Sequence, residues 1–143
     1  MSTAYGEDLA YTHDTGFGDF ARNAAPALLA ALSRVRENAP TRRLPVIDLG
    51  CGSGIWAEIL VKAGYDVLGF DISEAMIALA KKRVPQGRFH AQSFLTAELP
   101  SCGGVTAIGE CLSYLFDSNN TDESFGTIPS HLRRTGRRWA VCL

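Results

Sequence analysis

The chain lacks the features that define several classes of protein. No apolar run reaches the roughly 20 residues that a membrane span requires. The first residues form neither a basic segment nor an apolar one, so we expect no secretory signal and a cytoplasmic location. The net charge of −1 gives no electrostatic basis for binding nucleic acid or an anionic membrane.

Cysteines are few, and their spacing is not that of metal ligands. The four are Cys51, Cys102, Cys111 and Cys142. We therefore expect no metal site and reduced thiols. Cys51 falls within a glycine-rich segment, where it is either a reactive thiol or a small filler, and we favour the filler.

The composition that remains is that of one globular domain. The chain has 143 residues, which is long enough for a single domain with a core. Its residues are 46% hydrophobic and 20% charged, which are ordinary values for a globular protein. No internal repeat or low-complexity segment interrupts the chain. A soluble domain with an apolar interior is the class that these numbers favour.

The most informative stretch is Pro45–Leu60. The apolar run Val46–Leu49 leads into Gly50, Gly52 and Gly54, and an apolar segment compatible with a helix follows. Glycine tolerates positive φ and lets backbone approach a ligand closely. The start of a helix offers free N–H groups and the positive end of its dipole. The stretch predicts a nucleotide-type site after a buried strand; the alternative is a strand-turn-helix connection without a ligand.

Apolar periodicity and turn residues divide the rest of the chain into alternating elements. Helices are expected over Phe20–Asn38, Ile55–Ala63 (with Gly64 as its C-cap), Ser73 to about Arg83 (with Ser73 as its N-cap) and Asp122–Arg133. Strands are expected over Val46–Leu49, Tyr65–Phe70, Arg88–Ala91, Val105–Ile108 and Trp139–Leu143, with a loop over Leu95–Gly104. Pro26 either kinks the first helix or marks the first residue of its main part. Residues 1–18 are either a frayed tail or a segment that folds back over the domain, and we favour the second.

This alternation predicts an α/β fold, a Rossmann-like doubly wound parallel sheet with helices on both faces. Ligands of such sheets bind beyond the carboxyl ends of the strands, at the switch point that the first and fourth strands flank. The glycine turn, Asp71, Ser93 and Glu110 all follow strand ends, so we expect them to gather there.

Asp71 carries the most chemical information among these residues. It ends the second strand about 20 residues after Gly50, a spacing at which an acidic side chain binds a ribose diol. A carboxylate can accept two hydrogen bonds from such a diol. The alternative is a helix cap, but Ser73 is better placed for capping.

Two motifs give the chain a family resemblance. Asp48-Leu49-Gly50-Cys51-Gly52-Ser53-Gly54 is an acidic residue followed by G-x-G-x-G, and GFDISEAMIALAKKR over Gly69–Arg83 supplies an acidic strand end and a helix with a methionine. Together they resemble the class I S-adenosylmethionine-dependent methyltransferases over Pro45–Asp117.

The resemblance implies S-adenosylmethionine as cofactor. The three glycines would wrap its methionine part, Asp71 would hold the ribose, and Ile72 and Met76 would pack on the adenine. The cofactor-binding residues implied in this way are Asp48, Gly50, Cys51, Gly52, Gly54, Asp71, Ile72, Met76, Ser93, Phe94 and Glu110. Ser93 and Phe94 stand where the family often has an acidic residue.

The resemblance also implies where a methyl acceptor would bind. Glu110 and Cys111 follow the fourth strand, where family members line the transfer site. Tyr11, His13 and Phe17 fall where many members have a lid, and Tyr11, His13 and Tyr114 are the expected substrate-binding residues. His13, Glu110 and Tyr114 are candidate bases by position, and no catalytic residue is assigned. The acceptor is expected to be a small molecule, with neither nucleic acid nor membrane as partner.

The expected organisation is a lid segment and helix over residues 1–40 and a cofactor-binding core over residues 41–143. Family domains continue past a fifth strand into two more, so the resemblance implies a core truncated after strand five. An exposed fifth strand would leave an unprotected sheet edge, which predicts marginal stability or self-association.

Two alternative functions remain. A nicotinamide-dependent dehydrogenase would have G-x-G-x-x-G, which requires glycine where this chain has Ile55. The second alternative is a cofactor-binding domain that catalyses nothing.

Overall fold

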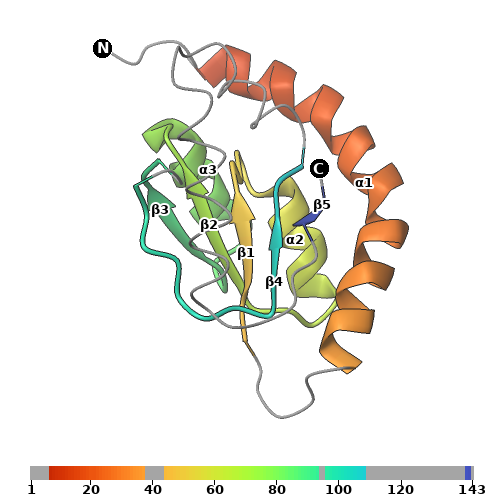
Figure 1. Ribbon diagram of the computed structural model, residues 1–143. Coiled ribbons are helices and arrows are strands. Elements are labelled where there is room, and N and C mark those ends of the chain that lie inside the picture. The colour runs from red at the N-terminus through yellow and green to blue at the C-terminus, as the bar shows by residue number, and fades with distance from the viewer. Residues whose placement is uncertain (1–6, 38–43, 94–95, 109–140, 143) are drawn as a thin grey trace, which may run out of the picture.

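The computed structural model describes residues 7–37, 44–93, 96–108 and 141–142, with side chains over 16–37, 44–93 and 96–108. Five parallel strands form one sheet in the order β3-β2-β1-β4-β5 (Figure 1). The strands are β1 Val46–Leu49, β2 Val67–Asp71, β3 Arg88–Ala91, β4 Gly104–Thr106 and β5 Val141–Cys142. The helices are α1 Glu7–Glu37, α2 Ile55–Lys62 and α3 Glu74–Arg83.

The strand order confirms the predicted switch point. β1 lies at the centre, with β2 on one side and β4 on the other. The chain therefore winds outward in one direction through β2 and β3 and in the other through β4 and β5. The carboxyl ends of β1, β2 and β4 meet where the glycine turn begins, which is where ligands of open parallel sheets bind.

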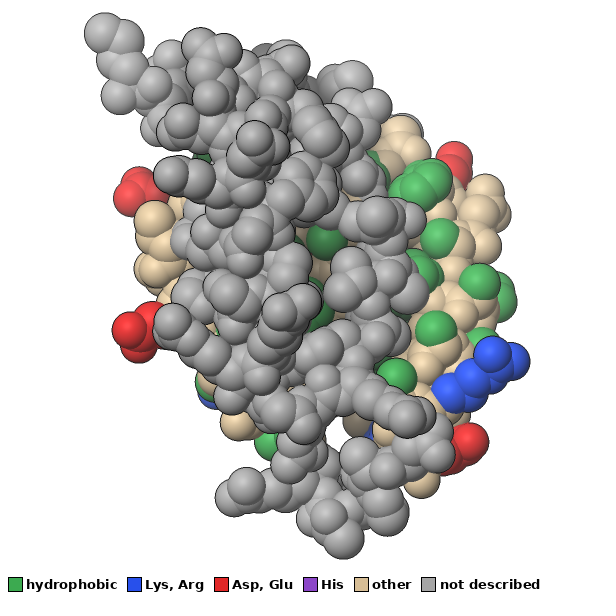
Figure 2. Space-filling model, viewed as in Figure 1, with side chains coloured by type: hydrophobic (Ala, Val, Ile, Leu, Met, Phe, Trp, Pro, Cys, Tyr) green, Lys and Arg blue, Asp and Glu red, His purple; other side chains and the backbone are tan. Residues whose placement is uncertain are grey.

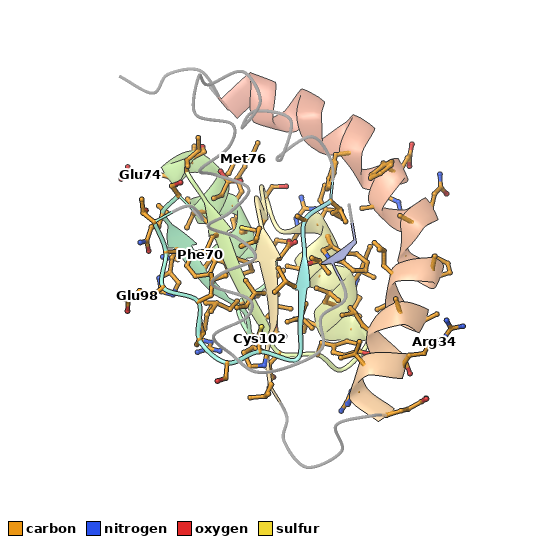
Figure 3. All side chains as sticks on the ribbon, viewed as in Figure 1. Arg34, Phe70, Glu74, Met76, Glu98 and Cys102 are labelled. Atoms are coloured by element: carbon orange, nitrogen blue, oxygen red, sulfur yellow. The ribbon has the colours of Figure 1, made fainter. Side chains whose placement is uncertain are left out.

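Strands β1 and β2 are buried on both faces of the sheet, as their apolar runs predicted. One core lies between the sheet and the helices and includes Leu32 of α1, Trp56 of α2 and Ile77 of α3. The other lies on the opposite face, where Phe70 and Cys102 contribute (Figure 3). The described helices all contribute to the first core. The helix expected over Asp122–Arg133 falls outside the described residues.

Helix α1 begins earlier than the sequence pattern indicated. It starts at Glu7 and continues through Pro26, so residues 7–18 are helical rather than a tail or a separate folded-back segment. Pro26 does not mark the first residue of the helix. Gly16 and Gly18 are poor helix formers, which hid the signal at this end. Packing provides the stabilisation that propensity does not, since Ala21 and Leu32 are buried against the rest of the domain.

Most of the remaining boundaries agree with prediction to within two residues. Strand β3 and the end of α3 are as expected, and β2 begins two residues later. Strand β4 starts at Gly104 and ends at Thr106, before the expected Ile108. Ala63 is the C-cap of α2, and Gly64 follows it with φ 85°, the conformation that terminates helices. The fifth strand is confirmed over Val141–Cys142, where it pairs with β4.

Candidate cofactor site

The turn after β1 has a backbone that requires glycine. Gly50, Gly52 and Gly54 have φ values of 69°, 53° and 85°, in the left-handed region that other residues rarely adopt. The amides of Gly50 and Cys51 both donate to the carbonyl oxygen of Phe70, at 2.8 and 2.9 Å. These bonds tie the turn to the end of β2, so its shape is fixed by the sheet.

Gly54 has a second reason to lack a side chain. A Cβ atom there would lie 3.1 Å from the Cα atom of Ala80, where α2 and α3 pack closely. Gly52, in contrast, faces open space, since a Cβ atom there would meet nothing within 4 Å. The turn is therefore packed at its helical end and accessible at its middle.

Asp71, at the end of the neighbouring strand β2, is hydrogen-bonded to the glycine turn. Its Oδ2 atom accepts a hydrogen bond from the amide of Gly52 at 2.9 Å, and its Oδ1 atom accepts one from the amide of Ser73 at 2.9 Å. An ionised carboxylate has about four acceptor positions, so each oxygen can accept one further bond. Asp71 is partly exposed, and within the described part of the chain Gly52 and Ser73 are the hydrogen-bond donors to its carboxylate.

The start of α3 lies at the same end of the sheet (Figure 3). Ser73 is the N-cap, as predicted, and its hydroxyl accepts from the amide of Met76 at 3.3 Å. The two residues expected to contact adenine differ in exposure. Ile72 is 77% exposed, whereas Met76 is buried. Ile72 therefore offers exposed apolar surface next to Asp71, whereas the side chain of Met76 is part of the buried interior.

Asp48 differs from the other candidate ligands because its side chain is buried. Its Oδ1 atom accepts a hydrogen bond from the hydroxyl of Thr106 at 2.9 Å, and that hydroxyl accepts from the indole N–H of Trp56 at 3.1 Å. Burial raises the pKa of Asp48 to about 7; the Thr106 bond opposes this shift, and the nearby charge of Asp71 adds to it. Burial therefore favours the neutral form of Asp48.

Cys51 is a packing residue, as favoured from the sequence. Its side chain is buried against β2, where a Cβ atom on Gly69 would lie 2.9 Å from its Sγ atom. Burial, then the carboxylates of Asp48 and Asp71, raise the pKa of the Cys51 thiol. A thiol that resists ionisation is a poor nucleophile.

The other candidate residues are placed as follows. Ser93 is partly buried just beyond β3, whose end is joined to β2 by a bond from the amide of Gln92 to the carbonyl oxygen of Asp71. Tyr11 and His13 lie in α1, without described side chains, and Phe17 packs against the helix-side core. Phe94, Glu110, Cys111 and Tyr114 lie outside the described residues.

Sequence reasoning missed Trp56, Thr106 and Gly69. A buried indole N–H usually has a partner, so Trp56 signals a polar group nearby. Thr106 places a hydroxyl group within a buried strand, and such a group also needs a hydrogen-bond partner. Which partners these residues meet depends on strand register and on how α2 packs, and the periodicity of the sequence determines neither.

Two absences hold for the described part of the chain. It contains no group of three or more His, Cys, Asp or Glu side chains able to hold a metal ion. Its helices are too short or too polar to cross a bilayer.

Comparison with known proteins assigns the family. The profile of a methyltransferase domain matches residues 46–136, well over half of the chain. A Geobacillus sp. (strain WCH70) protein whose name places it among the methyltransferases is 31% identical over 96 residues, which cover 64% of this chain and 39% of that protein. The chain belongs to the class I S-adenosylmethionine-dependent methyltransferase family.

Solved structures agree with this fold. CalS10, an amino pentose methyltransferase from Micromonospora echinaspora solved with S-adenosylmethionine, has a TM-score of 0.61 and 25% identity, covering 88% of this chain and 51% of that one. DesVI from Streptomyces venezuelae has a TM-score of 0.68 and 23% identity, covering 99% and 57%. The chain thus spans well under two thirds of the lengths of all three similar proteins. These matches do not favour the dehydrogenase alternative.

Proposed function

We propose that the chain binds S-adenosylmethionine at the Gly50–Gly54 turn and Asp71, and transfers its methyl group to a small-molecule acceptor. The observation that carries the proposal is the link between the two motifs. Three left-handed glycines at the switch point are joined to Asp71 by the Gly52 amide. This arrangement offers open backbone and a carboxylate side by side.

Each part of the cofactor has a complementary group. The open middle of the turn suits close approach by the methionine part. The free acceptor positions of Asp71 suit the two ribose hydroxyls, at roughly 1.5–3 kcal/mol for each charge-assisted bond. The exposed side chain of Ile72 suits the adenine ring. Ser93, Phe94 and Glu110 remain predicted contacts.

The bound cofactor would supply an activated methyl group, so the task of the chain is to hold an acceptor in line with it. Positioning of this kind supplies about 7–11 kcal/mol. A general base helps only where the acceptor must lose a proton. His13, Glu110 and Tyr114 remain the candidates for that role, and Tyr11, His13 and Tyr114 remain the candidates for acceptor binding.

The proposed acceptor is a small organic molecule. CalS10 is an amino pentose methyltransferase, which supports this class of acceptor for the present chain. We propose neither nucleic acid nor membrane as a partner. A cytoplasmic location remains a prediction, and so does the division into a lid segment with its helix and a core.

Calorimetric titration tests the proposal. Micromolar binding of S-adenosylmethionine, with no binding of NAD, is the expected result. Binding of NAD alone, or of neither compound, would overturn it. A cofactor-binding domain without activity would give the same binding result, so release of S-adenosylhomocysteine in the presence of amino sugars then separates the two functions.

A further inference from the structure

Helix α1 has an apolar outer surface beside the face that packs on the domain. The inner face is buried through side chains such as Ala21 and Leu32. A second row of apolar side chains, which we call the α1 stripe, runs along the helix next to this face and consists of Phe20, Ala24, Ala27 and Ala31. Phe20 is 51% exposed, Ala27 is exposed and the two others are half-buried. Figure 2 shows apolar side chains on this outer surface of α1.

The spacing of the α1 stripe is that of a contact between two helices. Its steps of four, three and four residues are those at which one helix packs along another. At 3.6 residues per turn the four positions fall within a sector of about 60°, centred about 110° around the helix from the buried inner face. Small side chains at such a contact allow a short distance between the helix axes. The stripe is thus a packing face separate from the core.

Phe20 is the largest side chain of the α1 stripe. Its ring lies against that of Phe17, with centroids 6.0 Å apart, and Phe17 packs on the helix-side core. The inner side of the Phe20 ring is therefore supported by the domain, while about half of its surface remains in water. Supported aromatic side chains of this kind are enriched at protein interfaces.

The charges at the two ends of the α1 stripe complement each other. Asp19 lies beside Phe20 at the first end, and Arg34 follows Ala31 at the other. Both charged side chains are exposed, and Figure 3 shows Arg34 extending outward from α1. Ala27 lies midway between Phe20 and Arg34, about 10 Å along the helix axis from each. A two-fold axis at Ala27 would therefore bring the Phe20 end of one chain to the Arg34 end of another.

The charges favour an antiparallel pair of helices. Such a pair places the Arg34 guanidinium against the Phe20 ring of the second copy and near its Asp19 carboxylate, which are both favourable contacts for a cation. A parallel pair would place Arg34 against Arg34. The helix dipoles also attract each other only when the helices are antiparallel. Asp19 is 3.1 Å from Arg22 within α1, and an exposed carboxylate has acceptor positions for a second donor.

Other occupants fit the α1 stripe less well than a second copy. Helix α1 contains five acidic and three basic residues, so an anionic membrane would repel it. An unrelated protein would have to present both a basic and an acidic group at the correct separation. A second copy supplies both through symmetry, since each end of a two-fold interface meets the other.

We propose that the α1 stripe is the interface of a two-fold symmetric dimer, in which the α1 helices of two copies pack antiparallel about Ala27. This contact lies in the helix layer, so it is distinct from pairing at the β5 edge, and it does not depend on cofactor binding. The stretch from Phe20 to Arg34 is about 21 Å long, which makes a small interface. The dissociation constant should accordingly be on the order of 10–100 µM.

Sedimentation velocity over protein concentrations from about 5 to 500 µM tests the dimer. The unaltered chain should pass reversibly from monomer to dimer over this range. Phe20→Ser should raise the dissociation constant by at least about tenfold, because the central aromatic contact is lost. Leu79→Ser is the matched control, since it removes an apolar side chain that is 38% exposed on α3, and it should leave the constant unchanged.

A charge exchange tests the antiparallel direction. Arg34→Glu should weaken the dimer, because it places a carboxylate against Phe20 and near Asp19 of the second copy. The double variant Asp19→Arg, Arg34→Glu restores opposite charges at both ends and should recover most of the affinity. Ala27→Glu brings two carboxylates together at the axis and should prevent dimerisation. Glutamate is a good helix former at an exposed position, so this variant should fold even if Phe20→Ser does not.

The outcomes separate the dimer from other arrangements and from the proposed function. A chain that stays monomeric at the highest concentration, whether or not it binds phosphatidylcholine vesicles, would overturn the proposal. A dimer left intact by Phe20→Ser and Ala27→Glu would place the interface elsewhere and overturn it as well. Equal weakening by Arg34→Glu and by the double variant would contradict the antiparallel arrangement. Titration of the same samples with S-adenosylmethionine tests the proposed function separately.

Discussion

Asp71 combines two tasks in one side chain. Each of its oxygens accepts one backbone amide, from Gly52 on one side and from Ser73 on the other, and each retains a position for a ligand. The same carboxylate thus fixes the turn and is proposed to bind the ribose. Its proposed role was predictable from its place after β2, whereas its bond to Gly52 required the folded turn.

Asp71→Ala should weaken S-adenosylmethionine binding by about 10- to 100-fold, because the diol bonds and the support of the turn are lost together. Calorimetric titration measures the change. Asp66→Ala is the matched control, since Asp66 is exposed at the opposite end of β2 and should leave the dissociation constant unchanged. An unaltered constant for Asp71→Ala would mean that the ribose binds elsewhere.

Asp48 should make stability depend on pH. Its folded pKa, about 7, lies above the ordinary aspartate pKa of 3.8, so the folded chain binds more protons than the unfolded chain between these limits. Stability should therefore fall as the pH rises from about 4 to 7 and then level off, by on the order of 2–4 kcal/mol for this group.

Urea unfolding at pH 5 and 8 measures this effect, with Asp48→Asn as the comparison. The variant keeps the acceptor for Thr106 and loses the buried charge, so its stability should change less between the two pH values. An equal loss of stability in both chains would assign the pH dependence to other groups.

Among the helices and strands, some boundaries follow from local sequence signals and others depend on tertiary packing. The start of α3 was predictable because Ser73 caps it and Met76 supplies the capped amide. The first part of α1 was not, because its glycines weaken the local signal while burial of residues such as Ala21 stabilises the helix. Thr106 bonds to Trp56 and to Asp48, which are both far from it in sequence. The β1–β4 register determines the bond to Asp48, and the packing of α2 on the sheet determines the bond to Trp56.

The contact between α1 and β4 depends on the absence of a side chain at Gly104. A Cβ atom there would lie 2.7 Å from the Cδ2 atom of Leu32, which is buried and has little room to move. Gly104→Ala should therefore destabilise the chain by about 1–3 kcal/mol through overpacking. Urea unfolding measures the change.

Gly16→Ala is the control for this prediction. Gly16 lies in α1, and a Cβ atom there would meet nothing within 4 Å. Replacement should be neutral or stabilising by about 0.5–1 kcal/mol, since alanine favours the helix. If Gly104→Ala were as well tolerated as this control, α1 would not be packed on β4 as described.

At the scale of the whole molecule, the sheet ends at a short strand. β5 pairs with β4 and has the outer position in the strand order. On the same side of the molecule, Figure 2 shows apolar side chains on the outer surface of α1, where Phe20 is 51% exposed. An open sheet edge favours pairing with a second chain, so self-association remains a prediction.

Thermal unfolding followed by circular dichroism tests this prediction at several protein concentrations. A marginal or self-associating domain should melt below about 55 °C or at a temperature that rises with concentration. A sharp transition above that temperature, independent of concentration, would contradict the prediction.

The proposed cofactor site consists of the glycine turn and Asp71, and a nuclear magnetic resonance titration of the labelled chain with S-adenosylmethionine tests this assignment. The amide signals of Gly50, Gly52, Gly54 and Ser73 should move, while that of Gly64, at the far end of α2, should not. Shifts confined to the opposite end of the domain, or no shifts at a saturating concentration, would contradict the assignment of the cofactor site.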